Sequence, residues 1–208
     1  MPTGLKTERT FCVVGIDPSA TGTGVAAIDL EEGTLLSTKR LAVGGFGVER
    51  LHRIKVALSE WLFSLPPVLH VAMEGYGFNI TDSQSHKLGE VGGVIKLLLY
   101  QELSAPANYP SFPAPSQVKK YATGKGTAKK EEMLKTVYRK WGVDLATSDE
   151  ADAYACAQIA RGVLKGSEVV YEKAVLQAMR NPAKNKAPLT WAEMPAPQRY
   201  EFAVDRRM

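Results

Sequence analysis

Short apolar runs and segments of helical periodicity alternate along the first 165 residues. Four runs have the length and composition of buried strands, at residues 11–16, 25–30, 34–43 and 68–75. The first two flank a turn rich in glycine and threonine, which predicts a β-hairpin. A fifth, short strand is predicted in the segment that begins at residue 109.

Helical spacing of apolar residues predicts the other elements. Helices are expected over residues 47–65, 82–103, 115–124, 127–142 and 148–164. The way these strands and helices follow one another along the chain indicates an α/β fold with a mixed sheet. The second helix contains Gly92 and Gly93, although each glycine costs a helix about 1 kcal/mol relative to alanine. This cost predicts close approach of another backbone, such as a helix across a dimer axis.

Composition narrows the class of protein. The chain has 208 residues, 45% apolar and 23% charged, as in ordinary globular proteins. Its apolar runs fall short of the roughly 20 residues that span a membrane, and its first residues do not resemble a signal peptide. A cytoplasmic protein without membrane contact is therefore expected. Beyond Lys165 the sequence becomes proline-rich, so we predict a domain over residues 1–165 and a C-terminal extension over residues 166–208, partly helical or flexible.

Cysteine and histidine do not indicate a metal or redox site. Cys12 and Cys156 lie in apolar runs, without the CxxC spacing or neighbouring histidine of a zinc site. Both are expected to be buried. The three histidines are scattered along the chain, and we assign them no catalytic role.

The net charge of +4 is unevenly distributed. Residues 117–140 form a basic block within an otherwise acidic body. The block contains Lys119, Lys120, Lys125, Lys129, Lys130, Lys135, Arg139 and Lys140. A run of this kind is either a solvated helix face or a surface for an anionic partner.

Acidic residues gather at a few structurally informative positions. Asp149 and Asp152 share one face of a predicted helix, whereas Glu150 turns aside. Alone, they would be typical of solvated acids in a first helical turn. Asp17 and Glu74, however, each end a predicted central strand, where open α/β sheets place their ligands. An unpaired acid is costly to bury at such a position.

Four carboxylates that converge on one sheet edge favour a hard divalent cation, Mg²⁺ or Mn²⁺. Two such ions about 3.5–4 Å apart clamp the attacking and leaving oxygens of a phosphoryl displacement. The acids therefore favour a metal-dependent site for phosphoryl chemistry. They also make DNA contact by the basic block a better interpretation than a solvated face.

Four motifs, taken in order, resemble one family. They are FCVVGIDPSATGTGVAAIDL, the strand that ends at Glu74, SQVKKYATGKGTAKKEEMLKTV and DEADAYACAQIA. They resemble the RuvC-type Holliday-junction resolvases of the ribonuclease-H-like superfamily, over about residues 11–164. The resemblance implies a mixed five-stranded sheet flanked by helices. It further implies a homodimer that resolves four-way DNA junctions by paired symmetric nicks, with two metal ions per active site.

The resemblance also assigns roles to single residues. The metal-binding catalytic acids would be Asp17, Glu74, Asp149 and Asp152. Some relatives have histidine at the third position, and Glu150 is a possible substitute for Asp149 there. One ion would be held by Asp17 and Asp152 and the other by Asp17 and Glu74.

The basic and aromatic assignments concern the DNA. Lys119 and Lys130 match catalytic lysines near the scissile phosphate, and the remaining DNA-binding lysines would follow the backbone, namely Lys120, Lys125 and Lys129. The family inserts an aromatic wedge a few residues after the strand glutamate. Gly77 stands at its usual position here, which leaves Tyr76 and Phe78 as candidates for base stacking, or equally for a role in the core.

Other functions fit less well. The segment TGKGT at 123–127 lacks the spacing of a Walker phosphate loop, and DEAD at 149–152 opens a helix without such a loop. The segment GIDPSATGTG is similar to the phosphate hairpin of actin-like ATPases, but those proteins generally need two such domains. No nucleotide cofactor is therefore expected. A branched-DNA nuclease that also cuts forks and flaps, and a junction-binding protein that does not cut, are the remaining alternatives.

Overall fold

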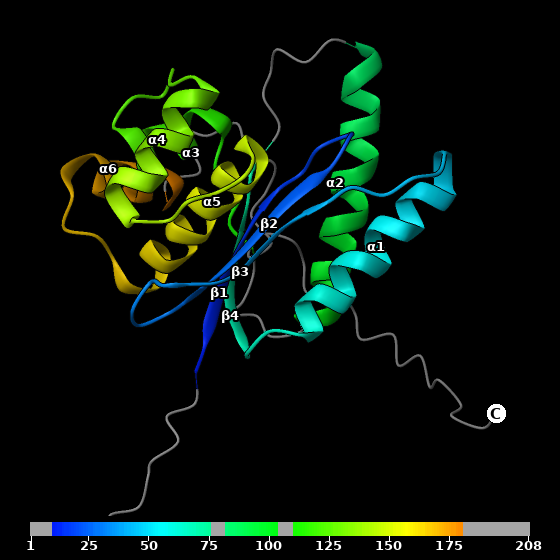
Figure 1. The fold of residues 1–208 in the computed structure, drawn as a ribbon, viewed down its shortest axis with the longest axis horizontal. Coiled ribbons are helices and arrows are strands. Elements are labelled where there is room, and N and C mark those ends of the chain that lie inside the picture. The colour runs from blue at the N-terminus through cyan, green and yellow to red at the C-terminus, as the bar shows by residue number, and fades with distance from the viewer. Residues whose placement is uncertain (1–9, 76–81, 104–109, 181–208) are drawn as a thin grey trace, which may run out of the picture.

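The computed structural model describes residues 10–75, 82–103 and 110–180 (Figure 1). Its strands are β1 (Cys12–Asp17), β2 (Thr23–Asp29), β3 (Leu35–Leu41) and β4 (Val68–Met73). Its helices are α1 (Gly47–Phe63), α2 (Asp82–Glu102), α3 (Pro115–Thr123), α4 (Lys130–Trp141), α5 (Ser148–Lys165) and α6 (Val170–Arg180). The predicted helices are confirmed, although α4 begins three residues later than predicted.

The strands form one mixed sheet with the order β3-β2-β1-β4. The hairpin prediction is confirmed, because β1 pairs antiparallel with β2, with Asp17 opposite Gly24. β4 lies parallel to β1 on the other side, with Ile16 opposite Met73. Both β1 and β4 therefore end at the same edge of the sheet, as the α/β prediction requires.

The predicted fifth strand is wrong, since the described residues contain a sheet of four strands. At the expected place a single bridge joins Ala72 to Ser111. The Ser111 backbone amide donates to the Val71 carbonyl at 2.8 Å, and the Ser111 carbonyl accepts from the Met73 amide at 2.9 Å. The Pro113 carbonyl accepts from the Gly75 amide at 2.8 Å, but Pro113 has no N–H to donate, so this pairing stays too irregular for a strand.

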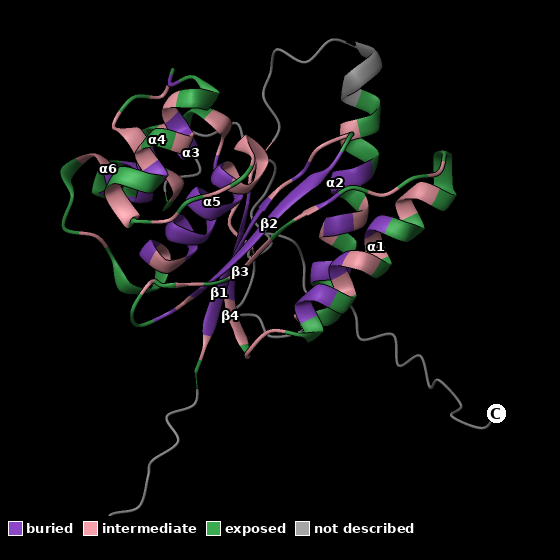
Figure 2. Ribbon diagram, viewed as in Figure 1, coloured by how far each residue is buried: buried purple, intermediate pink, exposed green. Residues whose placement is uncertain are grey.

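Helices cover both faces of the sheet (Figure 1). α1 and α2 pack on one face, where Val14, Ile16 and Val25 join the apolar side chains of both helices in one core cluster. The other face carries α3, α4, α5 and α6, whose core includes Val13 and Ala26. Figure 2 shows β1 and β2 buried between these two layers.

α5 lies unusually close to the sheet. A Cβ atom added to Gly15 of β1 would lie 1.9 Å from the Ala153 carbonyl oxygen, and one on Gly24 of β2 would lie 2.1 Å from the Asp149 carbonyl oxygen. The helix matches these gaps with small side chains, since its buried residues include Ala151, Ala153, Ala155, Ala157 and Ala160. Glycine on the strands and alanine on the helix thus set the distance between the two layers.

α6 follows the globular body and packs back on it. Val175 and Leu176 are buried in the same cluster as α3 and α5. Glu172 of α6 accepts a charged hydrogen bond from Lys140 of α4 at 2.5 Å. No helix in the described ranges is both long enough and apolar enough to cross a membrane.

We expect Gly15→Ala to destabilise the protein by about 1–3 kcal/mol, because its methyl group would overlap the α5 backbone. Gly44→Ala is the matched control, because the nearest atom to a Cβ there is an Arg53 side-chain nitrogen at 3.9 Å. Urea denaturation of the two variants tests this. Equal stability of both variants would contradict the close contact.

Candidate active site

One row of side-chain positions across the sheet gathers two of the predicted acids. Side chains alternate between faces along a strand, so Asp17 lies on the same face as Gly15, toward α5. The amide of Glu74 donates to the Ile16 carbonyl at 2.8 Å, which continues the parallel pairing one residue past β4. The row runs, in strand order, through Arg40, Gly24, Asp17 and Glu74.

The first turn of α5 supplies the other two acids. Thr147 is the N-cap, and its side-chain oxygen accepts from the Glu150 amide at 3.2 Å. The Glu150 carboxylate in return accepts from the Thr147 amide at 3.0 Å. This capping box occupies Glu150 and fixes where the helix begins. Since Gly24 admits the Asp149 backbone, Asp149 and Asp152 enter the site beside Asp17.

The four acids are half-buried and lie close enough together to shift one another's pKa values. Burial, followed by the charges of Glu74, Asp152 and Asp149, raises the pKa of Asp17 well above its ordinary value. Burial and then Asp152 raise the pKa of Glu74 to about 8. Burial also raises the pKa of Asp152 to about 6. The structure therefore brings together the four acids selected from the sequence.

Two predicted lysines partly offset this negative charge. Lys119 lies on α3 and is half-buried, whereas Lys130 begins α4 and is exposed. Both lower the pKa of Glu74 and of Asp152, against the larger effect of burial. The remaining predicted lysines, Lys120, Lys125 and Lys129, are exposed on α3 and on the segment before α4. They contribute to no resolved pKa shift of the acids.

The donor set suits a divalent cation. One carboxylate oxygen of Asp152, Oδ1, is buried and has no hydrogen-bond partner, which is costly for an isolated carboxylate. Such oxygens are the ligands that Mg²⁺ and Mn²⁺ prefer. Among the described residues, no three Asp, Glu, His or Cys side chains already have the spacing of ligands around one ion. Binding of a divalent ion would therefore draw the carboxylates of the site closer together.

Arg40 is the site residue that the sequence analysis missed. Its Nε donates to Asp149 Oδ2 at 2.9 Å from β3, the edge strand of the sheet. The only sequence signal was a charged residue near the end of a predicted strand. The β2–β3 register shifts between Ala27 and Ile28, so the partner of Arg40 could not be inferred by counting residues.

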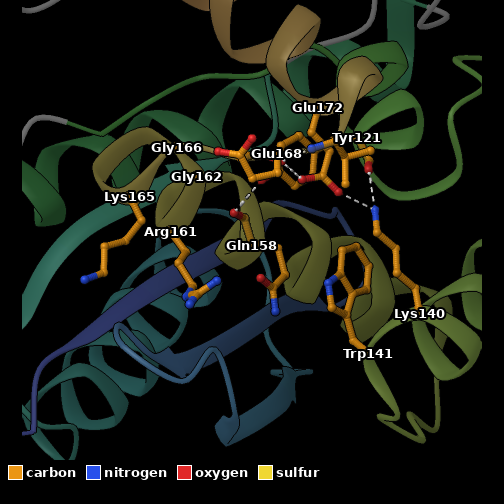
Figure 3. Close-up of a pocket in the computed structure, with 12 residues that line it drawn as sticks. Tyr121, Lys140, Trp141, Gln158, Arg161, Gly162, Lys165, Gly166, Glu168 and Glu172 are labelled. Atoms are coloured by element: carbon orange, nitrogen blue, oxygen red, sulfur yellow. Dashed lines mark hydrogen bonds and ion pairs between the residues drawn. The ribbon is translucent and has the colours of Figure 1, made fainter.

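The stacking candidates Tyr76 and Phe78 lie outside the described residues, so their predicted role stays a prediction. Figure 3 shows a cavity of about 450 Å³ between α4, α5 and α6, and none of the four predicted acids lines it. Lys140 and Glu172 line it and pair with each other. Arg161, which also lines the cavity, donates to the Leu30 carbonyl at 2.9 Å. The charged groups of Lys140, Glu172 and Arg161 therefore already have partners within the chain.

Comparison with known proteins places the chain in a family. The family model described as crossover junction endodeoxyribonuclease RuvC matches residues 13–160. This chain belongs to the RuvC family. A family member from Paenarthrobacter aurescens is 30% identical over 155 residues, covering 71% of this chain and 79% of that protein. A member from Anaeromyxobacter dehalogenans is 34% identical over 149 residues, covering 70% and 77%.

Solved structures agree with this assignment. RuvC of Thermus thermophilus is 27% identical with a TM-score of 0.60, covering 74% of this chain and 96% of that one. The same protein in complex with a Holliday junction substrate gives 25% identity and a TM-score of 0.61, with 75% and 96% covered. The yeast mitochondrial Holliday junction resolvase Ydc2, 13% identical with a TM-score of 0.52, shares the fold over 83% of this chain and 84% of its own.

Without bound metal, the stability of the protein should fall as the pH rises. The pKa of Glu74 is about 8 in the folded protein and 4.5 ordinarily, so between these values the folded state binds more protons than the unfolded state. We expect Glu74→Gln, in EDTA, to raise the free energy of unfolding at pH 8 by at least about 1 kcal/mol, since one pKa unit corresponds to about 1.4 kcal/mol. Little change is expected at pH 5.

The exposed acid Glu90 on α2 provides the control. Its substitution by glutamine should alter stability at neither pH. Urea titrations at pH 5 and pH 8 give the comparison. A Glu74→Gln variant that is less stable than the parent at pH 8 would contradict the proposed repulsion among the acids.

Proposed function

We propose that this protein is a metal-dependent endodeoxyribonuclease that resolves four-way DNA junctions by paired symmetric nicks. The observation that carries the proposal is the position of Asp17, half-buried at the sheet edge among Glu74, Asp149 and Asp152. Such a concentration of carboxylates is unfavourable unless positive charge joins it. The family's junction endonucleases give the substrate class, and the RuvC of Thermus thermophilus has been solved with a Holliday junction substrate.

The acids would hold two Mg²⁺ or Mn²⁺ ions, with Asp17 shared between them. Glu74 would complete one ion's ligands and Asp152 the other's, while Asp149 adds a further carboxylate oxygen. Bound divalent ions supply an activated water and stabilise the leaving oxygen of a phosphodiester. The chain itself fixes the carboxylates. The ends of β1 and β4 hold Asp17 and Glu74, and the capped first turn of α5 holds Asp149 and Asp152.

Lys119 and Lys130 would contact the phosphate that is cut. Both already act electrostatically on the acids, so a phosphate seated at the acids would lie within their field. Lys120, Lys125 and Lys129 are exposed and would follow the DNA backbone without reading its sequence. Tyr76 or Phe78 would stack on a base at the junction. No nucleotide cofactor is needed for this chemistry.

A homodimer would form through the outer side of α2. Gly89, Gly93 and Leu97 recur every four residues on that helix, and Leu97 is 53% exposed. A Cβ atom on Gly89 or Gly93 would meet nothing within 4 Å, so packing inside this chain does not require glycine there. A second α2 could approach closely along this stripe. Two active sites in one dimer would account for paired nicks.

The nuclease domain would span residues 1–165, with residues 166–208 as a C-terminal extension. The family model ends at residue 160, before α6. α6 packs on α3 and α5 through Val175 and Leu176, so the first part of the extension is helical and joined to the domain.

Asp152→Asn should abolish junction cleavage and keep junction binding, because it removes a ligand and a negative charge beside the phosphate. Labelled four-way junction, fork, flap and duplex substrates would be compared in Mg²⁺, Mn²⁺, Ca²⁺ and EDTA. Asp144→Asn is the control, since Asp144 is an exposed acid on the segment before α5.

The substrates separate the alternatives. Paired nicks confined to the junction, and to Mg²⁺ or Mn²⁺, support a resolvase. Equal cutting of forks and flaps would favour the broader branched-DNA nuclease. Binding without cutting by the parent protein would favour a junction-binding protein. Wild-type cleavage by Asp152→Asn would refute the assigned site.

Leu97→Glu should convert the dimer to a monomer, because two such charges would face each other across the α2 pair. Analytical ultracentrifugation would measure the mass, and cleavage would change from paired to single nicks. Val170→Glu is the control, because Val170 is an 81% exposed apolar residue on α6. An unchanged dimer in Leu97→Glu would exclude this face.

A further inference from the structure

Arg40 lies at the β3 end of the row of residues that crosses the sheet at the active site. It pairs in register with Gly24, which in turn pairs with Asp17. Its Nε donates to Asp149 Oδ2 at 2.9 Å, with the Arg40 side chain 35% exposed and that of Asp149 18% exposed. A half-buried ion pair between an edge strand and the first turn of a helix therefore borders the acids.

The turn between β1 and β2 leaves room for this guanidinium. A Cβ atom on Gly22 would lie 2.5 Å from the central carbon of the Arg40 guanidinium and 2.8 Å from its Nε. The backbone at Gly22 therefore borders the Arg40 guanidinium on the side of this turn, and Asp149 accepts the hydrogen bond from Nε. Arginine held in this way presents a donor in a fixed direction, which a flexible ammonium group does not do equally well.

The ion pair between Arg40 and Asp149 reduces the repulsion between Asp149 and the other acids. Asp149 adds its charge to that of Asp17 and Asp152, which are half-buried near Glu74. Repulsion would favour rotation of the Asp149 carboxylate toward solvent, to which its side chain is 18% exposed. The charge of Arg40 offsets this repulsion. It engages Oδ2, whereas among the described residues Oδ1 accepts only a long hydrogen bond, from Ser148 Oγ at 3.5 Å.

We propose that Arg40 is a positioning residue, which holds Asp149 by Oδ2 and leaves Oδ1 to bind a divalent ion. This inference rests on the proposed metal-dependent function. It assigns a role to an edge-strand residue that lies outside the four acids and the basic block. Partners that hydrogen-bond to a ligating carboxylate commonly contribute a factor of about 10–100 to metal affinity.

The test is a titration of the full chain with Mn²⁺ in the absence of DNA. Electron paramagnetic resonance measures the concentration of free Mn²⁺ at each step. Arg40→Ala should weaken Mn²⁺ binding about 10-fold or more. Arg40→Lys should recover part of the affinity, because it keeps the charge but loses the fixed Nε donor. Lys39→Ala is the matched control, since Lys39 is the next residue of β3, is exposed, and lies on the opposite side of the sheet.

A second variant moves the guanidinium without removing it. Gly22→Ala puts a methyl group where the Arg40 side chain lies, and that flexible side chain can shift without disturbing the backbone. We expect it to weaken Mn²⁺ binding in the same direction as Arg40→Ala, by a smaller factor. Thermal unfolding of each variant would establish that the fold is kept.

Asp152→Asn separates this inference from the proposed function. If Asp152→Asn binds Mn²⁺ as the parent does, the proposed metal site itself is wrong. If Asp152→Asn loses binding while Arg40→Ala and Gly22→Ala keep it, only the role of Arg40 is overturned. Tighter Mn²⁺ binding in Arg40→Ala would likewise overturn it, because Arg40 would then compete with the metal for Asp149.

Discussion

The backbone of α5 lies directly against the backbones of β1 and β2, and the active site depends on this contact. Gly15 and Gly24 permit it, because a side chain at either position would overlap the helix. An ordinary helix–sheet distance would leave Asp149 and Asp152 far from the strand-end acids. The alanines of α5 serve the same requirement from the other side of the contact.

Three carboxyl groups carry most of the energetic cost of forming the metal-free site. Asp17, Glu74 and Asp152 all have raised pKa values, with burial as the largest cause. Burying charge without a partner destabilises the folded state, whereas an ion that binds only the folded state stabilises it. The same repulsion that destabilises the metal-free protein would therefore favour metal binding. Lys119, Lys130 and Arg40 moderate it.

Much of this could be predicted from the sequence, because the decisive signals were local. Strand ends at Asp17 and Glu74, and the spacing of Asp149 and Asp152, follow from periodicity alone. The family assignment followed from the order of four motifs, and the family model confirms it. The basic block indicates an anionic partner, and the family resemblance selects Lys119 and Lys130 from it. Periodicity alone could not select them, because their approach to the acids depends on how α3 and α4 pack against α5.

The failures came where distant segments meet. A pattern of polar and apolar residues predicts the fifth strand, but Pro113 lacks the N–H that would continue the pairing beyond the bridge at Ser111. Arg40 gave no usable signal, because its position depends on a shifted register between β2 and β3. Neither feature could be read from a window of a few residues.

The two faces of the sheet differ in function, because the predicted site residues lie on only one of them in the described part of the chain. Alternation along β1 sends Ile16 toward α1 and α2 and Asp17 toward α5, so the chemistry lies on the α5 side. The lysines come from α3 and α4, which share that layer, and each can therefore reach the acids. The opposite layer carries no predicted site residue among the described residues. It leaves the outer side of α2 open for association, and a dimer formed there would leave both active-site faces clear for DNA.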